Sequence, residues 1–388
     1  MAKEIYLFNP ENDMALANFT SYYKAPTEIV HMANDLSVLP AWYAPKNSMI
    51  KIDSLLRISL LNKQSPAPSL IPKVEWTDSW KNLPYRPWGW NPSLLYTLQA
   101  SGIASKYLLT DAQMEKLRFL SGRQRCVDIL GAFHGINHLC GKTAICNSVS
   151  KVKELVSSTG ECILKAPWSG SGRGLVHISP EGWTPSVEGW LARILRVQGE
   201  IMVEPLYNKE KDFAMEFYAE GGKIHFAGYS LFETDPHGNY KANILLSDEN
   251  IERELTQYIP STTLHCVCQL LEQKLSQLFN KDYQGYLGVD MMICRTSNGH
   301  ALHPCVEINL RMNMGIVSRI IFNRYIHPQA KGKYIIEHYT KDGEAIDMYN
   351  QLTASHPVHL QNEKLTKGYF PLTPILQDTR YHIFLLVE

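Results

Sequence analysis

Carboxylates predicted to face each other across two strands are the clearest chemical signal in the sequence. The segment 286–315 reads YLGVDMMICRTSNGHALHPCVEINLRMNMG, and its Asn298-Gly299 dipeptide is preferred in two-residue type I′ hairpin turns, where both central residues take positive φ. A turn at these two residues predicts that Asp290 lies directly opposite Glu307, with Cβ atoms roughly 4.5–5.5 Å apart. Carboxylates in that position repel each other unless a cation lies between them.

The polar face of this predicted hairpin suits a hard metal ion. Alternation along the strands places Asn309 and Arg311 on the same face as Asp290 and Glu307. Carboxylate and amide oxygens favour Mg²⁺ or Mn²⁺ over zinc. A half-buried hairpin with a solvated polar face explains the pattern equally well. In either case the opposite face should be apolar and belong to a core, and it carries Val289, Met291, Ile293, Val306, Ile308 and Leu310.

A segment rich in glycine and serine is a second candidate for chemistry. Residues 162–178 read CILKAPWSGSGRGLVHI, which predicts a β-hairpin with a Gly/Ser tip at 169–174. Glycines let the backbone approach a phosphate closely, and successive N–H groups form an anion-binding concavity. Lys165, at the end of the first strand, can reach an α- or β-phosphate as a point charge. Most such loops are merely flexible connections, so this segment alone decides little.

The N-terminal residues begin like an open α/β sheet. Residues 5–8 form a predicted strand, followed by the polar loop Asn9 to Asp13 and a helix-prone run from Met14. Open sheets bind ligands at loops of this kind, although capping of the following helix is the commoner role of Asn and Asp. We therefore expect either a ligand site between this loop and Arg311 or, equally, pairing of Arg311 with a structural acid.

The rest of the chain mixes both kinds of periodicity. Helices are expected over 92–101, 111–133 with a break near Gly122, 248–279 and 316–325. Strands are expected over 201–207, 212–218, 223–232 and 380–387.

Composition and charge exclude several classes of protein. The 38 Lys and Arg residues balance 38 Asp and Glu, without a basic block, so nothing points to nucleic acid or to a membrane surface. The eight cysteines include no CxxC pair and are expected to be small buried hydrophobes in a reducing compartment. The N-terminus does not fit a signal peptide, and no apolar run is long enough to span a bilayer. These features predict a cytoplasmic protein, whose 388 residues suggest two or three domains or subdomains.

The order of the motifs resembles that of the ATP-grasp superfamily, which includes D-alanine–D-alanine ligase, biotin carboxylase and glutathione synthetase. A lysine before a Gly/Ser hairpin, then EPLY, DxxxE, DMM and EINLR, follow one another between residues 111 and 319. The resemblance implies an α/β (α+β ATP-grasp) fold. An open N-terminal α/β sheet domain would be followed along the chain by two α+β subdomains that grip ATP. We expect the N-terminal domain at 1–110, the lid subdomain with the Gly/Ser loop at 111–205, the metal-binding subdomain at 206–345 and a C-terminal extension ending in a strand at 346–388.

The resemblance also implies roles for matching residues around the nucleotide. Lys165 would hold the α- and β-phosphates, and Glu204 and the backbone of Leu206 would meet the adenine edge. Asp212 stands where the family often has a ribose-binding acid. The second nucleotide-contacting lysine of the family has no counterpart, and the nearest basic residues are Arg123 and Arg125. The phosphates would be covered by the Gly/Ser loop, with Ser169, Gly170, Ser171 and Gly172.

The remaining matches concern the metal and the reaction. Asp290, Glu307 and Asn309 match the metal ligands of the family, and Arg311 matches an arginine that some members use near the reacting acceptor. The implied reaction uses ATP with Mg²⁺ or Mn²⁺: an acceptor carboxylate attacks the γ-phosphoryl group, and an amine or other nucleophile, such as a thiol, then displaces phosphate from the acyl phosphate.

Three functions remain open from the sequence. The first is this ligase, the second is a kinase or phosphotransferase on the same scaffold, and the third is a non-catalytic nucleotide-binding protein. The intact acid pair and Lys165 argue against the third. The expected partners are a small-molecule carboxylate acceptor and a nucleophile, such as an amino acid or peptide, with no nucleic acid and no membrane. An exposed edge of the N-terminal sheet could pair in a homodimer.

Overall fold

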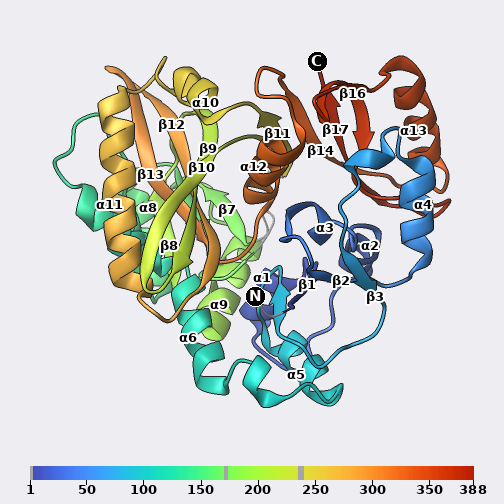
Figure 1. Cartoon of the computed structure of the whole chain (residues 1–388). Coiled ribbons are helices and arrows are strands. Elements are labelled where there is room, and N and C mark those ends of the chain that lie inside the picture. Colours follow the sequence, from blue (N-terminus) through green and yellow to red (C-terminus); the bar gives the residue numbers. More distant parts are fainter. Residues whose placement is uncertain (1–2, 170–173, 235–239) are drawn as a thin grey trace.

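The computed structural model describes residues 3–169, 174–234 and 240–388 (Figure 1). Within these ranges the strands form a nine-stranded sheet and two four-stranded sheets, with helices between them. This mixture confirms the predicted α/β class. All eight cysteines lie within the described ranges and are free thiols. None of the helices in these ranges is long and apolar enough to cross a membrane.

The first strand lies inside a parallel sheet, as the opening pattern of the chain predicts. This region contains β1 (Ile5–Leu7), α1 (Asn12–Asn18), α2 (Thr27–Asp35), α3 (Pro40–Tyr43), β2 (Met49–Lys51), α4 (Leu56–Gln64), η1 (Pro68–Leu70), β3 (Glu75–Thr77), β4 (Tyr85–Pro87), α5 (Pro92–Ala100) and η2 (Ser105–Tyr107). The sheet order is β3-β2-β1-β4, and β1 pairs in parallel with β2 and β4. Ile5 and Leu7 pack with α5, while Tyr6 packs against the cluster around Ile50. With both faces covered, the polar loop after β1 is left at the carboxyl end of the strand, where open sheets present ligand sites.

A small antiparallel sheet carries the predicted Gly/Ser hairpin. This region contains α6 (Asp111–Ser121), α7 (Gln124–Leu130), η3 (Gly131–Phe133), β5 (Ala144–Cys146), α8 (Val149–Thr159), β6 (Cys162–Lys165), β7 (Leu175–Ile178), α9 (Pro185–Gln198) and β8 (Ile201–Pro205). The sheet order is β5-β8-β6-β7, and Lys165 pairs with Leu175 across the hairpin. Helices α8 and α9 pack on the sheet through residues such as Val152 and Leu191. The hairpin is therefore confirmed on both sides of residues 170–173, which lie outside the described ranges.

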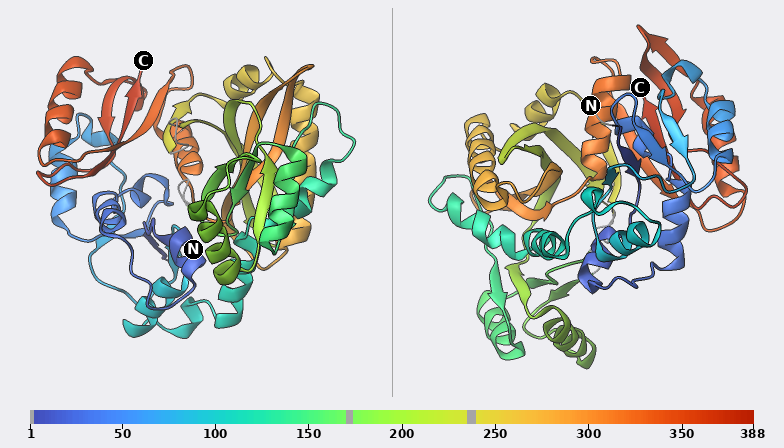
Figure 2. Two further views of the ribbon diagram at one scale, coloured as in Figure 1. Left: turned by 180° about the vertical axis from the view of Figure 1, so that it is seen from behind. Right: turned by 60° about the horizontal axis from the view of Figure 1, so that its bottom comes forward.

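The nine-stranded sheet carries the predicted hairpin with facing carboxylates at one end. It is built from β9 (Lys209–Glu220), β10 (Lys223–Thr234), β11 (Tyr240–Leu245), β12 (Gly285–Thr296), β13 (Gly299–Asn309), β14 (Gly332–His338), β15 (His359–Gln361), β16 (Lys364–Pro371) and β17 (Tyr381–Val387), with the helices α10 (Asp248–Leu255), α11 (Ser261–Phe279), α12 (Met314–Tyr325) and α13 (Glu344–Ser355). The strand order is β13-β12-β9-β10-β11-β14-β17-β16-β15. Helix α11 packs on the apolar face of β9, β10 and β12 (Figures 1 and 2). The opposite face of these strands is left for polar side chains.

The register of the β12–β13 hairpin agrees with the prediction at its base and differs at its turn. Asp290 pairs with Glu307 as predicted. The turn is nevertheless formed by Ser297 and Asn298, because Thr296 pairs with Gly299, so the predicted turn at Asn298-Gly299 is wrong. A bulge in β13 reconciles the two observations. Asp290 and Met292 are two residues apart on β12, but their partners Glu307 and His303 are four residues apart on β13. Pro304 lies inside this bulge, where a missing backbone N–H is tolerated.

The bulge also changes which side chains of β13 reach the core. Val289, Met291, Ile293, Ile308 and Leu310 are buried in the core cluster as predicted. Val306 is not among them and is only half-buried, so its predicted core position is wrong. The extra residues of the bulge turn Cys305 into the core in its place, beside Cys126 of α7.

The last strands of the chain pack against the N-terminal helices. Trp42 of α3 is fully buried, donates a hydrogen bond from Nε1 to the Leu372 carbonyl at 2.7 Å and packs edge-on against Phe370. Gln64 at the end of α4 exchanges two hydrogen bonds with the backbone of Ile375, each 2.8 Å long. The C-terminal residues therefore hold the N-terminal helices in place.

Candidate functional site

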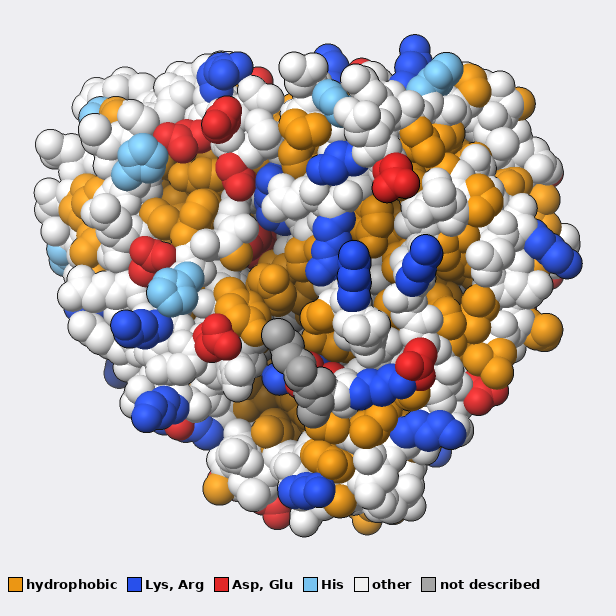
Figure 3. All heavy atoms as spheres, in the orientation of Figure 1, with side chains coloured by type: hydrophobic (Ala, Val, Ile, Leu, Met, Phe, Trp, Pro, Cys, Tyr) orange, Lys and Arg blue, Asp and Glu red, His pale blue; other side chains and the backbone are white. Residues whose placement is uncertain are grey.

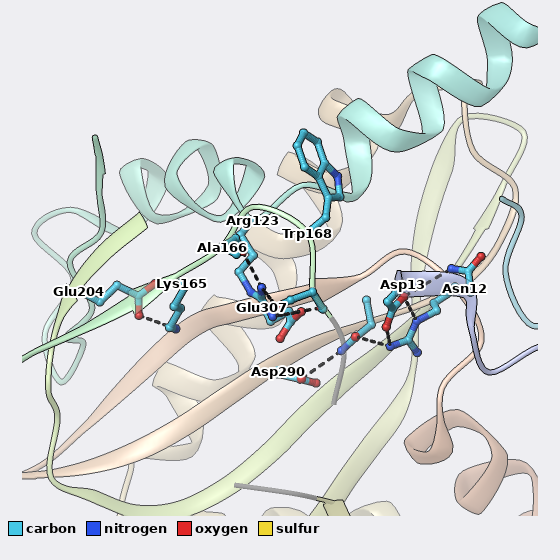
Figure 4. Close-up of polar contacts among 12 residues, drawn as sticks. Asn12, Asp13, Arg123, Lys165, Ala166, Trp168, Glu204, Asp290 and Glu307 are labelled. Carbon is cyan, nitrogen blue, oxygen red and sulfur yellow. Dashed lines mark hydrogen bonds and ion pairs between the residues drawn. The ribbon is translucent and has the colours of Figure 1, made fainter. Parts of the chain in front are cut away.

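Asp290, Glu307 and Asn309 lie on one face of the β12–β13 hairpin, as predicted. Figure 4 shows Asp290 and Glu307 on this face. Asn309 Nδ2 donates a hydrogen bond to Asp290 Oδ2 at 3.0 Å. Burial, and then the negative charge of Glu307, raise the pKa of Asp290 to about 7. The two carboxylates therefore repel each other at close range, and a cation between them would relieve that repulsion.

This donor set fits a hard divalent cation. Two carboxylates and an amide supply only oxygen ligands, which suits Mg²⁺ or Mn²⁺. Across the described residues, no group of three His, Cys, Asp or Glu side chains could hold a metal ion, so any site of this kind must use an amide such as that of Asn309.

Arg123 connects this face to the base of the Gly/Ser hairpin (Figure 4). Its Nη2 donates to Glu307 Oε1 at 2.7 Å, and its Nη1 donates to the Ala166 carbonyl at 2.7 Å and to Ser169 Oγ at 2.6 Å. Arg125, the other residue considered for the missing lysine, pairs instead with Asp128. Of the two arginines, Arg123 is therefore the one that enters the site, from the start of α7.

Lys165 and Glu204 form a buried ion pair on neighbouring strands of the small sheet. Lys165 Nζ lies 2.6 Å from Glu204 Oε2, and the two residues are 5% and 3% exposed. Glu204 Oε1 also accepts a hydrogen bond from Thr143 at 3.1 Å. A buried pair of this kind leaves an uncompensated charge if one partner is removed.

The other described residues that were predicted to contact the nucleotide already have hydrogen-bond partners within the protein. The N–H of Leu206 donates to the Glu161 carbonyl at 2.8 Å, so that backbone donor is already occupied. Asp212 of β9 accepts hydrogen bonds from Lys209 and Thr234. Ser169 is held by Arg123, whereas Gly170, Ser171 and Gly172 lie outside the described residues.

Arg311 meets the loop after β1, as the prediction of a shared site required. Its Nε and Nη2 donate to the two carboxylate oxygens of Asp13 at 2.7 and 2.5 Å, and Nη2 also reaches Asn309 Oδ1 at 3.3 Å. The loop does not cap α1 through its side chains: Glu11 occupies the N-cap without a side-chain hydrogen bond to the helix backbone, and Asn9 donates to the Gly89 carbonyl. The sequence predicted either that Arg311 pairs with an acid or that it shares a site with this loop. The Arg311–Asp13 ion pair satisfies both descriptions, because the acid belongs to the loop.

A small pocket of about 30 Å³ lies beside this pair. It is walled by Asp13 and Leu16 of α1, by Trp168 at the base of the Gly/Ser hairpin, and by Glu307 and Arg311. Figure 3 shows this face of the molecule hollowed near its centre, with Lys and Arg side chains gathered around the hollow. At this volume the pocket holds about one or two water molecules.

The Arg311→Lys substitution is expected to lower the melting temperature by several degrees and to impair any substrate-stimulated ATP turnover. Lysine cannot reproduce a bidentate fork on Asp13, and the half-buried carboxylate would lose about 1–2 kcal/mol of stabilisation. Thermal unfolding measures the first effect and coupled ADP release measures the second. If both survive the change, Arg311 is neither structural nor catalytic.

Glu216 is the site-facing residue that the sequence reading did not assign. It lies on β9 opposite Gly288, is 1% exposed, and accepts a hydrogen bond from Asn313 Nδ2 at 3.0 Å. A Cβ at Gly288 or at Gly315 would clash with its carboxylate, so the two glycines leave the space that it fills. The DxxxE spacing could have revealed it, because residues four apart on a strand share a face with each other.

The Glu216→Gln substitution is expected to remove part of the pH dependence of stability. Burial raises the pKa of Glu216 to about 8, so the folded chain keeps a proton that the unfolded chain releases above its ordinary value of 4.5. The stability of the wild type should therefore fall as the pH rises from about 5 to 8, by an amount of the order of a few kcal/mol, and the glutamine variant should lack this decline. Denaturant unfolding between pH 5 and 8 measures the free energy of unfolding of both proteins. Parallel curves of that free energy against pH would contradict the prediction.

Comparison with known proteins places the whole chain in one fold. No protein-family model and no curated protein sequence matches it. Among solved structures, N5-carboxyaminoimidazole synthetase from Staphylococcus aureus complexed with ADP matches with a TM-score of 0.50 and 11% identity, over 100% of this chain and 93% of that one. Biotin carboxylase from Campylobacter jejuni matches with a TM-score of 0.52 and 10% identity, over 100% and 88%. The biotin carboxylase domain of 2-oxoglutarate carboxylase from Hydrogenobacter thermophilus matches with 0.51 and 12%, over 100% and 86%.

These similarities confirm the predicted fold. The matched proteins have the ATP-grasp fold, and the similarity extends over the whole of this chain. At 10 to 12% identity it concerns the fold alone.

Proposed function

We propose that this protein is an ATP- and Mg²⁺-dependent ligase that activates the carboxylate of a small acceptor as an acyl phosphate and transfers the acyl group to an amine or another nucleophile. The main support is the convergence of the Asp290–Glu307–Asn309 face and the Arg311–Asp13 pair, with a small pocket between them, at one place in an ATP-grasp fold. The structures of similar fold that were solved with ADP or MgADP support a nucleotide as the ligand of this fold.

Asp290, Glu307 and Asn309 would hold the metal. A bound Mg²⁺ or Mn²⁺ supplies positive charge that neutralises the phosphate oxygens. Arg123 already neutralises Glu307 through a 2.7 Å contact, and it can turn to the phosphates once a cation takes over that carboxylate. Arg123 would in this way take the place of the second lysine of the family.

The nucleotide would lie between the small sheet and the hairpin. Lys165 would hold the α- and β-phosphates as a point charge, while the pairing with Glu204 keeps its ammonium group oriented. Glu204 and the backbone of Leu206 would border the adenine, and Asp212 the ribose. The segment from Ser169 to Gly172 would cover the phosphates and exclude water, which would otherwise hydrolyse the acyl phosphate.

The chemistry needs positioning and charge neutralisation rather than a covalent bond to the protein. A carboxylate oxygen of the acceptor attacks the γ-phosphorus, the bond from that phosphorus to the bridging oxygen breaks, and ADP leaves. The nucleophile then attacks the carbonyl carbon, and inorganic phosphate leaves. Arg311 would orient the acceptor carboxylate beside Asp13.

A screen for ADP release tests this function. Purified protein with ATP and Mg²⁺ is offered amino acids, peptides and other small carboxylates, and hydroxylamine traps any acyl phosphate as a hydroxamate. We expect ADP release and hydroxamate formation that both depend on one class of carboxylate. A stable phosphorylated product without hydroxamate would identify a kinase instead, and a chain that binds no ATP would overturn the proposal.

A further inference from the structure

Two free thiols from different parts of the chain meet close to the polar face of the β12–β13 hairpin. Cys294 of β12 follows Asp290 by four residues, so alternation places it on the same face of the sheet, and it is 0% exposed. Cys140 lies between η3 and β5 and is half-buried. The two side chains hydrogen-bond to each other, and the charge of Asp212 acts on Cys294.

The backbone holds both cysteines at this meeting point. Cys294 pairs with Ala301 on β13. The next residue of that strand, Leu302, accepts a hydrogen bond from the N–H of Cys140 at 2.9 Å and donates one to the His138 carbonyl at 2.8 Å. Both cysteines are therefore fixed to neighbouring residues of one strand, and the contact between their thiols follows from regular backbone pairing.

The segment that carries Cys140 reaches over the polar face of the sheet. A Cβ at Gly141 would lie 3.0 Å from Cε1 and Nε2 of His303, which pairs with Met292 on that face. The same segment continues into β5 of the small sheet. A covalent bond between Cys140 and Cys294 would therefore join the small sheet to the nine-stranded sheet.

The shared hydrogen bond makes the two thiols chemically different. It lowers the pKa of Cys140 in spite of burial, and together with burial it raises the pKa of Cys294. Cys294 thus keeps its proton and donates it to the sulfur of Cys140, which is the one that carries negative charge. The thiolate is the nucleophilic form of cysteine, and Cys140 is also the more exposed of the two, so oxidation should begin there.

We propose that Cys140 and Cys294 form a site of reversible oxidation by hydroperoxides, at which a disulfide ties the segment leading into β5 to β12. This modification goes beyond the proposed ligase function and does not depend on it.

Hydrogen peroxide shows how the reaction balances. The Cys140 thiolate attacks one peroxide oxygen, the O–O bond breaks, and hydroxide leaves and takes up a proton to become water. The Cys294 sulfur then attacks the sulfur of the resulting sulfenic acid, the S–O bond breaks, the S–S bond forms, and a second water leaves with the proton of the thiol. The two thiols are oxidised and the peroxide is reduced to water. A dithiol such as dithiothreitol reverses the modification by thiol–disulfide exchange.

A second pair of neighbouring thiols serves as an internal comparison. Cys126 of α7 and Cys305 of β13 also share a hydrogen bond, but they are 2% and 1% exposed and belong to the core cluster. Neither sulfur is open to a peroxide in solution. This pair should therefore remain reduced under conditions that oxidise Cys140.

The test treats the purified full chain with hydrogen peroxide, alkylates the remaining thiols after denaturation and maps the disulfides by peptide mass spectrometry. We expect a Cys140–Cys294 disulfide that dithiothreitol reverses, with Cys126 and Cys305 still alkylated. The oxidised protein should also unfold at a higher temperature, because the bond closes a long loop and restricts the unfolded chain.

Variants assign the two roles. Cys294→Ala should accumulate a sulfenic acid at Cys140, detected as its dimedone adduct, and Cys140→Ser should form neither the adduct nor the disulfide. Cys266→Ser is the matched control, because it removes another half-buried thiol, on α11, and it should oxidise like the wild type.

The wild type alone can overturn the inference. It would do so if peroxide left Cys140 and Cys294 as free thiols, joined Cys140 to another cysteine, or drove Cys140 to a sulfinic acid while Cys294 stayed reduced. An oxidised protein that unfolds at a lower temperature would also overturn it, since the two thiols would then have been forced together.

Discussion

The Glu307→Gln substitution is expected to lower substrate-stimulated ADP release by about a hundredfold or more, the scale of loss when one charge-stabilising group leaves an active site. Glu307 faces Asp290 across the hairpin and pairs with Arg123 at 2.7 Å, so its charge acts on both the proposed metal and the proposed phosphate site. Glutamine keeps the shape and removes the charge. The measurement is initial rate at saturating ATP over a range of Mg²⁺ concentrations, where the variant should also need more metal.

Glu210→Gln is the matched control. Glu210 lies on β9 and pairs with the exposed Arg295 at 2.6 Å, away from the metal face. Its replacement removes one carboxylate and one surface ion pair, which contributes little to stability, and should leave the rate unchanged. If Glu307→Gln behaved like this control, the metal assignment would have to be abandoned.

Lys165→Met is expected both to destabilise the protein and to weaken ATP binding. The substitution leaves Glu204 buried and unpaired, which costs about 3–5 kcal/mol. Loss of a charged hydrogen bond to the phosphates should also raise the dissociation constant for ATP by about tenfold to a hundredfold. Denaturant unfolding measures the first effect and calorimetric titration the second. From the sequence, Lys165 is expected only as a phosphate contact, and the buried pair with Glu204 adds a structural role.

The double variant Lys165→Met, Glu204→Gln separates the two effects. With the buried carboxylate neutralised, most of the lost stability should return, while the affinity for ATP should stay well below that of Glu204→Gln alone. Recovery of affinity together with stability would show that Lys165 acts only by holding the fold together.

The sequence predicted the polar face of the hairpin because alternation is a local property. Strand periodicity and a pairing register are enough to predict that Asp290, Glu307 and Asn309 share a face. The predicted register started from the wrong turn, and the bulge around Pro304 brought Asp290 back opposite Glu307. Proline in a strand interior is a known sign of a bulge, and it was the signal that could have corrected the turn.

Contacts between distant parts of the chain were beyond such local rules. Asp13 and Arg311 are 298 residues apart, and the sequence could name both as candidates without showing that they pair. Arg123 and Arg125 are both arginines two residues apart, and only the packing of α7 decides which one faces the site. The protonation of Glu216 follows from burial on all sides, which depends on Gly288 and Gly315 from two different elements.

The contacts of Trp42 and Gln64 with the last strands have a consequence for biosynthesis. During synthesis, α3 and α4 leave the ribosome long before Leu372 and Ile375 have been added to the chain. The apolar surface of Trp42 therefore stays exposed until almost the whole chain has emerged. A premature stop codon anywhere upstream of β16 would leave this surface uncovered for good. Shortened translation products of this protein should therefore be clients of chaperones and proteases, and should not accumulate as smaller folded proteins.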